Sequence, residues 1–343
     1  MQPFVWGGGV DKRFFGDGGF FHADRRARFI ATKARPPANA PDEARPLILN
    51  TGRVRDQWHT MTRTGKSVRL AGHRPEPAIE IHPRDASARG LADGDIAEVA
   101  SRWGQGVMRV QVTDALRIGG VFAPMHWTAQ VSCAGRINAA VNPAVDPISG
   151  QPELKHTPVE IHRLDIRWHG TILARRPIML PEIPYWARIK GAGHHAYVVA
   201  GDQPFAVAQR TLSAAVRTTN PGPWLIGENG VGAVISDGRV EAAVALGPLH
   251  DVEARDRFAP YMALDRLTAE QRDELLRGGT DTHRGGELCA CFGVSRGAVE
   301  AAIAEGAASL AAVGATTDAG TNCGSCRPEI RALLRAARLV KVA

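Results

Sequence analysis

Residues 78–112, AIEIHPRDASARGLADGDIAEVASRWGQGVMRVQV, decide how the first half of the chain folds. Ala78–Ile81 alternates apolar and polar side chains, which predicts a strand with one buried face, and the following His82-Pro83 ends it. Asp85–Arg89 suits a single helical turn, and Asp93-Gly94-Asp95 is a turn signal. The stretch therefore predicts short β-strands joined by tight connections.

The same pattern continues on both sides of this stretch. Ile96–Ser101 and Val107–Val112 predict a hairpin around the glycines at 104 and 106. Upstream, Leu47–Leu49 is a short apolar strand that ends in the polar turn 50–53. Several short strands separated by Gly, Pro and Asp favour a β-barrel, which we place at residues 46–165.

Length and composition indicate an ordinary globular protein of more than one domain. The chain has 343 residues, of which 44% are hydrophobic, and single cores rarely grow beyond about 250–300 residues. The formal net charge of +7 comes from arginines scattered among acids, without the concentrated basic stripe that nucleic-acid binders show. We therefore expect no nucleic-acid partner.

The N-terminal segment and the hydropathy pattern give no sign of export or membrane insertion. Met1–Val10 lacks a basic region followed by an apolar run, so we do not expect a secretory signal. No run of about 18 apolar residues occurs, so we expect no membrane span. The expected compartment is the cytoplasm, where close cysteine pairs indicate metal or redox chemistry rather than structural disulfides.

The second half of the chain divides into a linking region and a short helical end. In residues 166–284 the pattern predicts an α+β region, with a hairpin over 234–246 around Asp237-Gly238 and a helix over 267–276 capped by Thr268. The adjacent His194 and His195 are expected at the surface.

Residues 285–343 predict a small domain that is mostly helical. Ser295 is expected to cap a helix over 297–304, and a second helix is expected over 307–313. Pro328 suits the first turn of a third helix that runs to about residue 339.

Four of the five cysteines lie in this last segment, as Cys289-x-Cys291 and Cys323-x-x-Cys326. Thiolates bind iron strongly, and four of them complete the coordination of a [2Fe–2S] cluster. Two close pairs also fit structural zinc, although zinc sites more often use two C-x-x-C pairs, and idle thiols are a third interpretation. The spacing alone favours iron–sulfur over zinc without excluding it.

A wider motif surrounds these cysteines. The stretch CACFGVSRGAVEAAIAEG (289–306), followed by AGTNCGSCRPEI (319–330), resembles the bacterioferritin-associated-ferredoxin-like [2Fe–2S] domain over about residues 286–338. The resemblance implies that Cys289, Cys291, Cys323 and Cys326 are all cluster ligands.

A second candidate site follows the first strand of the barrel. Thr51-Gly52-Arg53 and residues 58–65 form a polar loop with arginines and hydroxyl groups, which suits phosphate recognition. The loop is not a P-loop, because Gly65-Lys66-Ser67 would need a glycine where Thr60 stands. From composition alone, a solvated loop without a ligand is the stronger alternative.

Three stretches of the barrel carry a second resemblance. LILNTGRVRDQWHTMTRTG (47–65), EIHPRDASARGLADGDIAEVASRWG (80–104) and NPAVDPISGQPELKHTPVEI (142–161) are similar to the molybdopterin dinucleotide-binding domain of molybdenum oxidoreductases. The resemblance implies a six-stranded double-psi β-barrel. It also implies two groups of cofactor contacts, at Thr51, Gly52, Arg53, Trp58, His59 and Thr62, and at Asn142, Asp146 and Lys155.

The order of the two domains resembles the C-terminal half of the bacterial assimilatory nitrate reductases. The resemblance implies a mixed α/β multi-domain chain: a lead-in segment (1–45), the barrel (46–165), the α+β linking region (166–284) and a small helical [2Fe–2S] domain (285–343). It implies nitrate reduction to nitrite at a molybdenum bis-(molybdopterin guanine dinucleotide) centre. The implied partners are an N-terminal catalytic portion and an electron-donating reductase or ferredoxin.

The chain also departs from that family. It has no N-terminal cysteine cluster, and its fifth cysteine, Cys133, lies in the barrel and is expected to be structural. We therefore expect no catalytic residue or molybdenum ligand here, and a fragment or split subunit that is inactive alone. Alternatives are a non-catalytic molybdopterin or iron–sulfur carrier, a remnant, or part of another molybdenum enzyme such as a formate dehydrogenase. The sequence leaves the donor and the oligomeric state open.

Overall fold

The computed structural model describes residues 13–29, 31, 34–147, 149–251, 253–279 and 285–340, without the side chains of 338–340. The chain divides into two compact units, residues 1–38 and 39–343. Within the described residues, no helix is both long and apolar enough to cross a bilayer.

The smaller unit has no regular secondary structure in its described part. Its phenylalanines contact one another, with the rings of Phe15 and Phe20 stacked at 4.7 Å between centroids, whereas Phe29 is fully exposed. Arg25 pairs with Asp17 at 2.6 Å.

A closed barrel opens the larger unit, as the pattern of short strands predicts, and it has the six strands that the resemblance implies. The strand order is β1-β5-β2-β4-β3-β6, with β1–β5 and β2–β4 parallel and the other pairs antiparallel. The strands are β1 (Leu47–Gly52), β2 (Ala78–Ile81), β3 (Ile96–Ala100), β4 (Gln105–Val112), β5 (Gly120–Pro124) and β6 (Thr157–Arg163). Four short helical segments join them: η1 (Thr64–Lys66), α1 (Val68–Gly72), α2 (Pro83–Ser87) and η2 (Ile137–Ala139).

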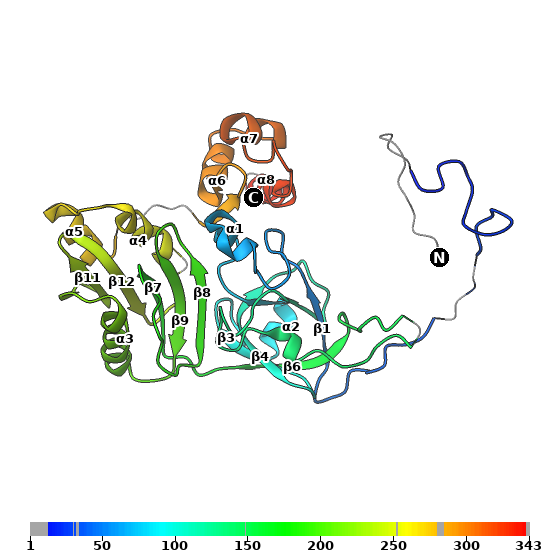
Figure 1. Cartoon of the computed structure of the whole chain (residues 1–343), viewed down its shortest axis with the longest axis horizontal. Helices are drawn as coiled ribbons and strands as arrows, with labels where there is room; N and C mark the ends of the chain where they lie inside the picture. Colours follow the sequence, from blue (N-terminus) through cyan, green and yellow to red (C-terminus); the bar gives the residue numbers. More distant parts are fainter. Residues whose placement is uncertain are drawn as a thin grey trace. The chain divides into compact units, whose positions relative to one another are not determined.

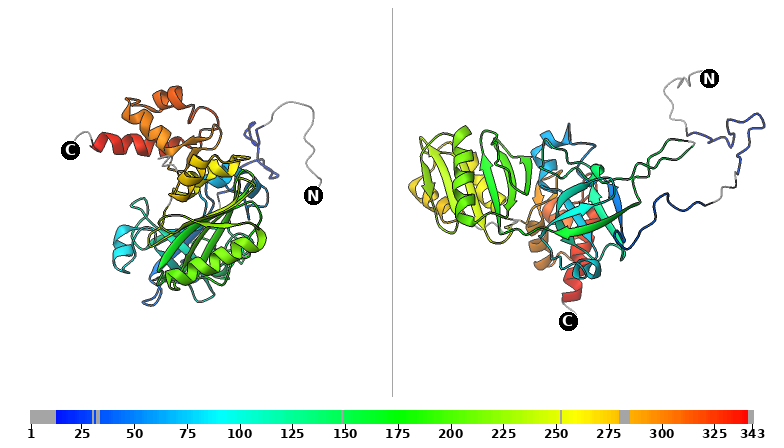
Figure 2. Two further views of the ribbon diagram at one scale, coloured as in Figure 1. Left: turned by 90° about the vertical axis from the view of Figure 1, so that its left-hand side faces the viewer. Right: turned by 90° about the horizontal axis from the view of Figure 1, so that it is seen from below.

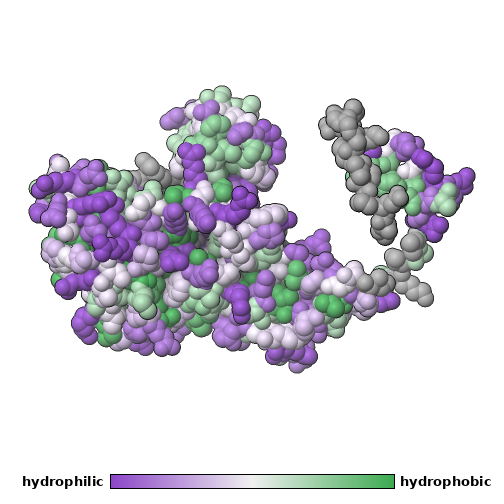
Figure 3. Space-filling view, in the orientation of Figure 1, coloured by the Kyte–Doolittle hydropathy of each residue, from purple (hydrophilic) through white to green (hydrophobic). Residues whose placement is uncertain are grey.

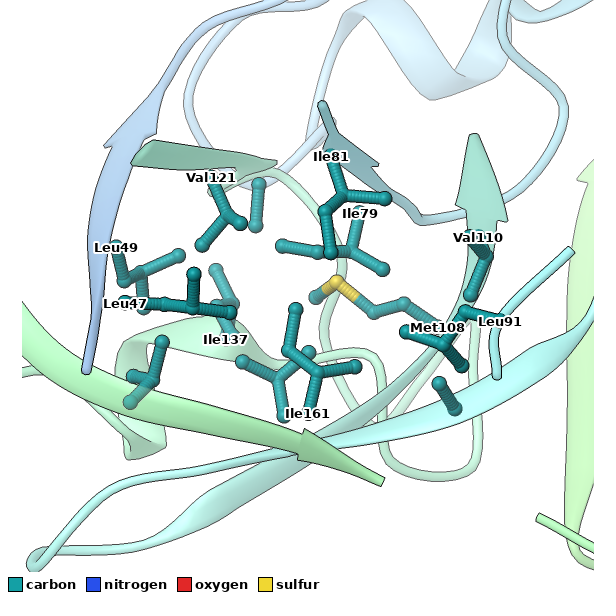
Figure 4. Close-up of a cluster of buried hydrophobic side chains, with 14 of the residues drawn as sticks. Leu47, Leu49, Ile79, Ile81, Leu91, Met108, Val110, Val121, Ile137 and Ile161 are labelled. Atoms are coloured by element: carbon teal, nitrogen blue, oxygen red, sulfur yellow. The ribbon is translucent and has the colours of Figure 1, made fainter. Parts of the chain in front are cut away.

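Alternation along the strands fills the barrel. In β2 only Ile79 and Ile81 are buried, and they pack with Met108 and Val110 of β4 (Figure 4). The expected β3–β4 hairpin is confirmed, but β4 begins two residues earlier than predicted. The reason is that Ser101 closes the turn early: its Oγ accepts hydrogen bonds from the backbone N–H groups of Trp103 and Gly104.

The helical turn expected at 85–89 is shifted by two residues. Pro83 occupies the first helical position of α2, and the Nδ1 atom of His82 accepts a hydrogen bond from the Arg84 N–H. A proline at this position is already preorganised for a helix, so the helix starts at the residue that the sequence analysis treated as a strand breaker.

An antiparallel six-stranded sheet follows the barrel, in the order β10-β11-β12-β7-β9-β8 (Figures 1 and 2). Its strands are β7 (Trp168–Ala174), β8 (Tyr185–Lys190), β9 (His195–Gly201), β10 (Trp224–Ile226), β11 (Val231–Ser236) and β12 (Arg239–Gly247). The helices are α3 (Phe205–Thr219), α4 (Ala254–Ala263) and α5 (Ala269–Leu276).

Helices cover both faces of this sheet. Ile172 of β7 packs in one core with Leu212 of α3, whereas its neighbour Leu173 packs in another with Phe258 of α4, so α3 and α4 lie on opposite faces. The outer surface over α4 and α5 is largely hydrophilic (Figure 3).

Two local predictions in this region are confirmed and one is wrong. The β11–β12 hairpin turns through Asp237 and Gly238, both at positive φ, and Thr268 caps α5 through a capping box with Gln271. His194, expected at the surface, is buried with its Nδ1 atom 3.0 Å from the Ala192 carbonyl oxygen, because the turn before β9 folds its ring inward.

The last segment packs helices around a two-stranded ribbon. Its elements are β13 (Glu287–Cys289), β14 (Val294–Ser295), α6 (Arg296–Ala304), α7 (Leu310–Thr317) and α8 (Arg327–Val340). The Ser295 cap is confirmed, but the helix expected over 307–313 begins at Leu310, because Ser309 caps it and the Ala307 N–H instead bonds Ala302 at the end of α6.

Candidate functional site

The four C-terminal cysteines lie together. Cys289 ends β13, Cys326 immediately precedes α8, and Cys291 and Cys323 lie in the adjoining loops. The Sγ atoms of Cys291 and Cys323 are 3.3 Å apart, and Cys289 and Cys326 pack in one cluster and interact through their thiols. Each contact joins one cysteine of the first motif to one of the second, so the fold brings the two distant motifs into one site.

Burial and hydrogen bonding make the four thiols unequal. Cys289 and Cys326 are each 3% exposed, and burial, with the Cys289 thiol, raises the pKa of Cys326 to about 11. Cys323 is exposed, and the Ser325 hydroxyl, 2.8 Å from its sulfur, lowers the pKa of Cys323. A bound metal deprotonates thiols in either environment, so both pairs can serve as ligands.

The four cysteines line a single cavity of about 570 Å³. Gly324, at a φ of +76°, provides the tight turn between Cys323 and Cys326. Among the described residues, no group of three or more His, Cys, Asp or Glu side chains is arranged to hold a metal ion. The four thiols that line this cavity are the donor set that a [2Fe–2S] cluster would take.

The other wall of this cavity is the barrel loop after β1. Arg55, Asp56, Gln57 and Trp58 line it together with the cysteines. The Arg55 side chain donates to the Leu288 carbonyl oxygen at 2.8 Å and to the Glu329 carboxylate at 2.9 Å. One barrel side chain therefore contacts the chain on both sides of the cysteine cavity.

Further polar contacts reinforce this attachment. His73 lies 3.0 Å from Glu329 through Nε2 and 3.2 Å from Asp56 through Nδ1. Arg69 of α1 donates to the Cys291 carbonyl oxygen at 3.1 Å. Glu329 has its pKa lowered, because the hydrogen bond and charge of His73 and the charge of Arg55 outweigh burial.

His126 fixes the shape of the barrel loop. Its Nε2 atom accepts a hydrogen bond from the Val54 N–H at 2.9 Å, so Nδ1 carries the proton and donates to the His59 carbonyl oxygen at 2.6 Å. Burial lowers the pKa of His126 and favours this neutral form. His59 and Met61 both have positive φ, a conformation that non-glycine residues adopt only where surrounding contacts hold them.

The first predicted group of dinucleotide contacts is partly assembled. Thr51 is buried and donates to the Leu154 carbonyl oxygen at 2.8 Å, and Lys155 donates to the Thr51 carbonyl oxygen. A Cβ atom at Gly52 would lie 2.7 Å from the Phe122 ring, so the backbone passes close to β5 here. These bonds place Lys155 beside the end of β1.

Arg53, Trp58, His59 and Thr62 are exposed along the following loop. The Arg53 guanidinium lies 4.6 Å from the Trp58 ring centroid, a cation–π distance, and Trp58 is 51% exposed. Trp58 also lines the cysteine cavity. The residue is therefore common to both candidate sites.

Asn142 and Asp146 organise their own loop. Asn142 is 3% exposed, and its side chain bonds the Glu153 and His156 carbonyl oxygens and the Ala144 N–H. Asp146 accepts from the Ser149 N–H at 2.7 Å. The side chains of Asn142 and Asp146 thus hold the loop 142–157 in shape, and Thr51 contacts this loop at Leu154 and Lys155.

A basic cavity of about 880 Å³ adjoins the loop after β1. Thr60, Thr62 and Lys66 line it, together with cationic side chains from elsewhere in the larger unit: Arg74, Arg136, Arg188 and Lys190. Such a wall suits phosphate groups. Arg74, Arg136, Arg188, Lys190 and His73 lie outside the motifs quoted above, so no pattern singles them out. Arg55, Asp56 and Glu329 lie inside those motifs, but only the fold shows that they meet beside the cysteines.

Comparisons with known proteins agree with both resemblances. Residues 47–158 match the family model described as molydopterin dinucleotide binding domain, and residues 288–336 match the BFD-like [2Fe-2S] binding domain. The chain therefore contains these two domains, in the order that the sequence analysis predicted, and they match the two predicted cofactors.

Three curated relatives are similar to longer parts of the chain. A nitrate reductase of Klebsiella oxytoca is 37% identical over 329 residues, covering 92% of this chain and 37% of the relative. A nitrate reductase of Shewanella frigidimarina is 32% identical, covering 49% of the chain and 20% of the relative. A formate dehydrogenase subunit alpha of Methanocaldococcus jannaschii is 33% identical, covering 42% and 21%. The chain thus spans well under half the length of these relatives.

Proposed function

We propose that this chain supplies the dinucleotide-binding wall and the electron-entry cluster of a molybdenum oxidoreductase that reduces nitrate. The observation that carries the proposal is the similarity to the Klebsiella oxytoca nitrate reductase, which extends over 92% of the chain and includes both cofactor domains. The overall reaction consumes two electrons and two protons per nitrate and yields nitrite and water. A catalytic portion that ligates molybdenum acts with this chain.

The residues of the chain divide this work between two sites. Cys289, Cys291, Cys323 and Cys326 would hold a [2Fe–2S] cluster, which would supply one-electron transfer from a reductase or ferredoxin. Molybdenum bound to the pterin supplies the oxygen-transfer chemistry. The chain itself binds the guanine dinucleotide and fixes its orientation.

Dinucleotide binding is assigned to the loop after β1 and to Lys155. Thr51, Gly52, Arg53, Trp58, His59 and Thr62 form the first group of contacts, and Asn142, Asp146 and Lys155 form the second. The basic wall beside Thr62 supports the assignment, since phosphate favours guanidinium and ammonium donors.

The proposed domain order along the chain is the one that the resemblance implies. The segment 1–45 leads into a double-psi barrel at 46–165, the region 166–284 links it to a small helical [2Fe–2S] domain at 285–343, and the protein works in the cytoplasm. The two parallel strand pairs in an otherwise antiparallel six-stranded barrel support the double-psi type.

Iron analysis of the purified chain tests the cluster. We expect two irons and two acid-labile sulfides per chain, with the visible absorption and the EPR signal of a reduced [2Fe–2S] centre. Cys323→Ser should lose them, whereas Cys133→Ser should keep them, because the Cys133 thiol contacts Trp186 and Pro184 away from the cavity. A colourless protein with one zinc per chain would refute the assignment.

Activity requires a second assay. Co-expression with the catalytic portion of a nitrate reductase should give nitrate reduction that depends on this chain and is lost with Cys323→Ser. The similarity to a formate dehydrogenase subunit over 42% of the chain makes formate oxidation the second candidate. Formate-dependent activity without nitrate reduction would favour it.

A further inference from the structure

Arg55, in the barrel loop after β1, contacts the C-terminal segment 285–340, which we call the cysteine domain, at two points. Its guanidinium donates to the Leu288 carbonyl oxygen, next to Cys289, and to Glu329, three residues after Cys326. The side chain is only 14% exposed and lines the cavity that the four cysteines share. A positive charge is therefore held beside the place where the cluster would lie.

The charges around Arg55 are paired. Asp56 lies 2.9 Å from the guanidinium, Glu329 lies 2.9 Å from it, and His73 contacts both carboxylates. Removal of the Arg55 charge would leave two carboxylates near the cavity without their main partner. Removal of the Glu329 carboxylate would leave the guanidinium less compensated. The two changes alter the local charge in opposite directions.

We propose that Arg55 both fixes the cysteine domain on the dinucleotide-binding loop and raises the reduction potential of the cluster. This inference rests on the proposed function in assigning a [2Fe–2S] cluster to the cavity. Reduction adds one negative charge to the cluster, and a nearby guanidinium stabilises that charge more strongly at low exposure than in water.

Arg55 lies in a loop shared by the cluster site and the predicted dinucleotide site, so a change in reduction potential there bears on electron transfer between them. Arg55 lies two residues after Arg53 and three before Trp58, which are predicted dinucleotide contacts, and Trp58 lines the cysteine cavity as well. The same short loop thus forms a wall of the cluster site and a wall of the dinucleotide site. A higher reduction potential favours electron transfer from the donor to the cluster. The electrons are then held next to the dinucleotide site.

If Arg55 only docks the cysteine domain, its replacement should shift the reduction potential in the opposite direction. If Arg55 only held the domains together, its loss would expose the cluster to water. Water stabilises the more negative reduced form, so the potential would rise. If the Arg55 charge acts on the cluster, its loss lowers the potential. Arg55→Gln removes the charge, Arg55→Lys keeps a charge but loses the fork that bridges Leu288 and Glu329, and Glu329→Gln removes a negative charge instead.

EPR-monitored redox titration of the purified full chain measures the midpoint potential of each variant. We expect a lower potential for Arg55→Gln, a potential nearer to the original for Arg55→Lys, and a higher one for Glu329→Gln. Arg102→Gln is the matched control, because Arg102 is an exposed barrel arginine paired with Asp42 and does not line the cavity. Its potential should not change.

The outcomes separate the inference from the proposed function. Full iron and sulfide content with an unchanged or raised potential in Arg55→Gln would overturn the inference and leave the cluster assignment intact. An original chain without iron would overturn the cluster assignment and the inference with it. If Arg55→Gln does not assemble a cluster, the comparison of Arg55→Lys and Glu329→Gln decides, and shifts of the same sign would count against a charge effect.

Discussion

His126 determines the conformation of the loop after β1, although it lies 67 residues from its partner His59 in the sequence. Arg53, Trp58 and His59 stand in a motif that predicts cofactor contacts, whereas His126 stands in none. His126 follows a strand and lies between apolar residues. From this sequence alone, a histidine that holds a loop by hydrogen bonds cannot be distinguished from an ordinary core side chain. Only the fold shows which backbone groups its two ring nitrogens meet.

His169 of β7 illustrates how burial at one residue creates a dependence on pH. Burial, the charge of Arg109 and the neighbouring His250 lower the pKa of His169 from 6.5 to about 4. Its Nδ1 atom is buried without a hydrogen-bond partner among the described residues. The folded protein therefore keeps this ring neutral over a range in which the unfolded chain binds a proton.

We predict that His169 makes the protein less stable as the pH falls from 6.5 to 4. The unfolded state gains a proton in this window and the folded state does not, so the free energy of unfolding decreases; below pH 4 both states are protonated and the effect stops. Between pH 7.5 and 5.5 the loss should be at most about 1 kcal/mol, because solvent screens part of the interaction of this partly exposed ring. Urea unfolding at both pH values should show a smaller difference for His169→Gln.

A histidine elsewhere provides the control for this measurement. His162 lies exposed near the end of β6, so His162→Gln should keep the pH dependence of the original chain. An equal loss of stability in the original chain and in His169→Gln would show that other groups cause the dependence.

At the scale of single elements, side-chain caps set where the helices of the C-terminal half begin. Thr268, Ser295 and Ser309 each accept a hydrogen bond from a backbone N–H in the first turn of the following helix. Thr268 forms a full capping box, because the Gln271 side chain also accepts from the Thr268 N–H at 2.9 Å. These bonds satisfy donors that a helix leaves open at its start.

Replacement of Thr268 by alanine tests the cap of α5. The change removes the acceptor for the Gln271 N–H, so we expect a loss of about 1 kcal/mol in unfolding free energy. Thr268→Ser keeps the hydroxyl and should retain most of the stability. Urea denaturation followed by circular dichroism measures both variants, and equal midpoints for alanine and serine would rule out a stabilising cap.

The sequence predicts these elements better than it predicts the site. The hairpins β3–β4 and β11–β12 follow from local alternation and turn residues, and the caps of α5 and α6 follow from local spacing. The start of α7 was misplaced, because an alanine-rich run looks helical wherever it begins and only Ser309 fixes the first turn. The contacts of Arg55 with Leu288 and Glu329 cross more than 230 residues, so no local pattern encodes them.

At the scale of the larger unit, a buried polar network joins the barrel to the following sheet. Glu76, just before β2, accepts from Arg109 of β4 at 2.8 Å and from the Tyr185 hydroxyl of β8 at 2.6 Å. His250 lies 3.5 Å from the same carboxylate. Around it, Ile96 and Val107 of the barrel pack in one core with Tyr185 and Val198 of the sheet, among other residues. The polar network therefore lies inside an otherwise apolar interface between the barrel and the sheet.

This arrangement predicts a large effect for Glu76→Gln. The amide can still bond the Tyr185 hydroxyl, but Arg109 loses its negative partner while it stays buried, and a buried charge without compensation costs about 3–5 kcal/mol. Urea unfolding should show this loss, whereas Asp273→Asn, which removes one partner of an exposed pair with Arg272, should leave the midpoint unchanged. Glu76 and Arg109 belong to the barrel and Tyr185 to the sheet. The barrel and the sheet should therefore still unfold together, at a lower urea concentration than in the original chain. A midpoint for Glu76→Gln equal to that of Asp273→Asn would show that the apolar core alone holds this joint.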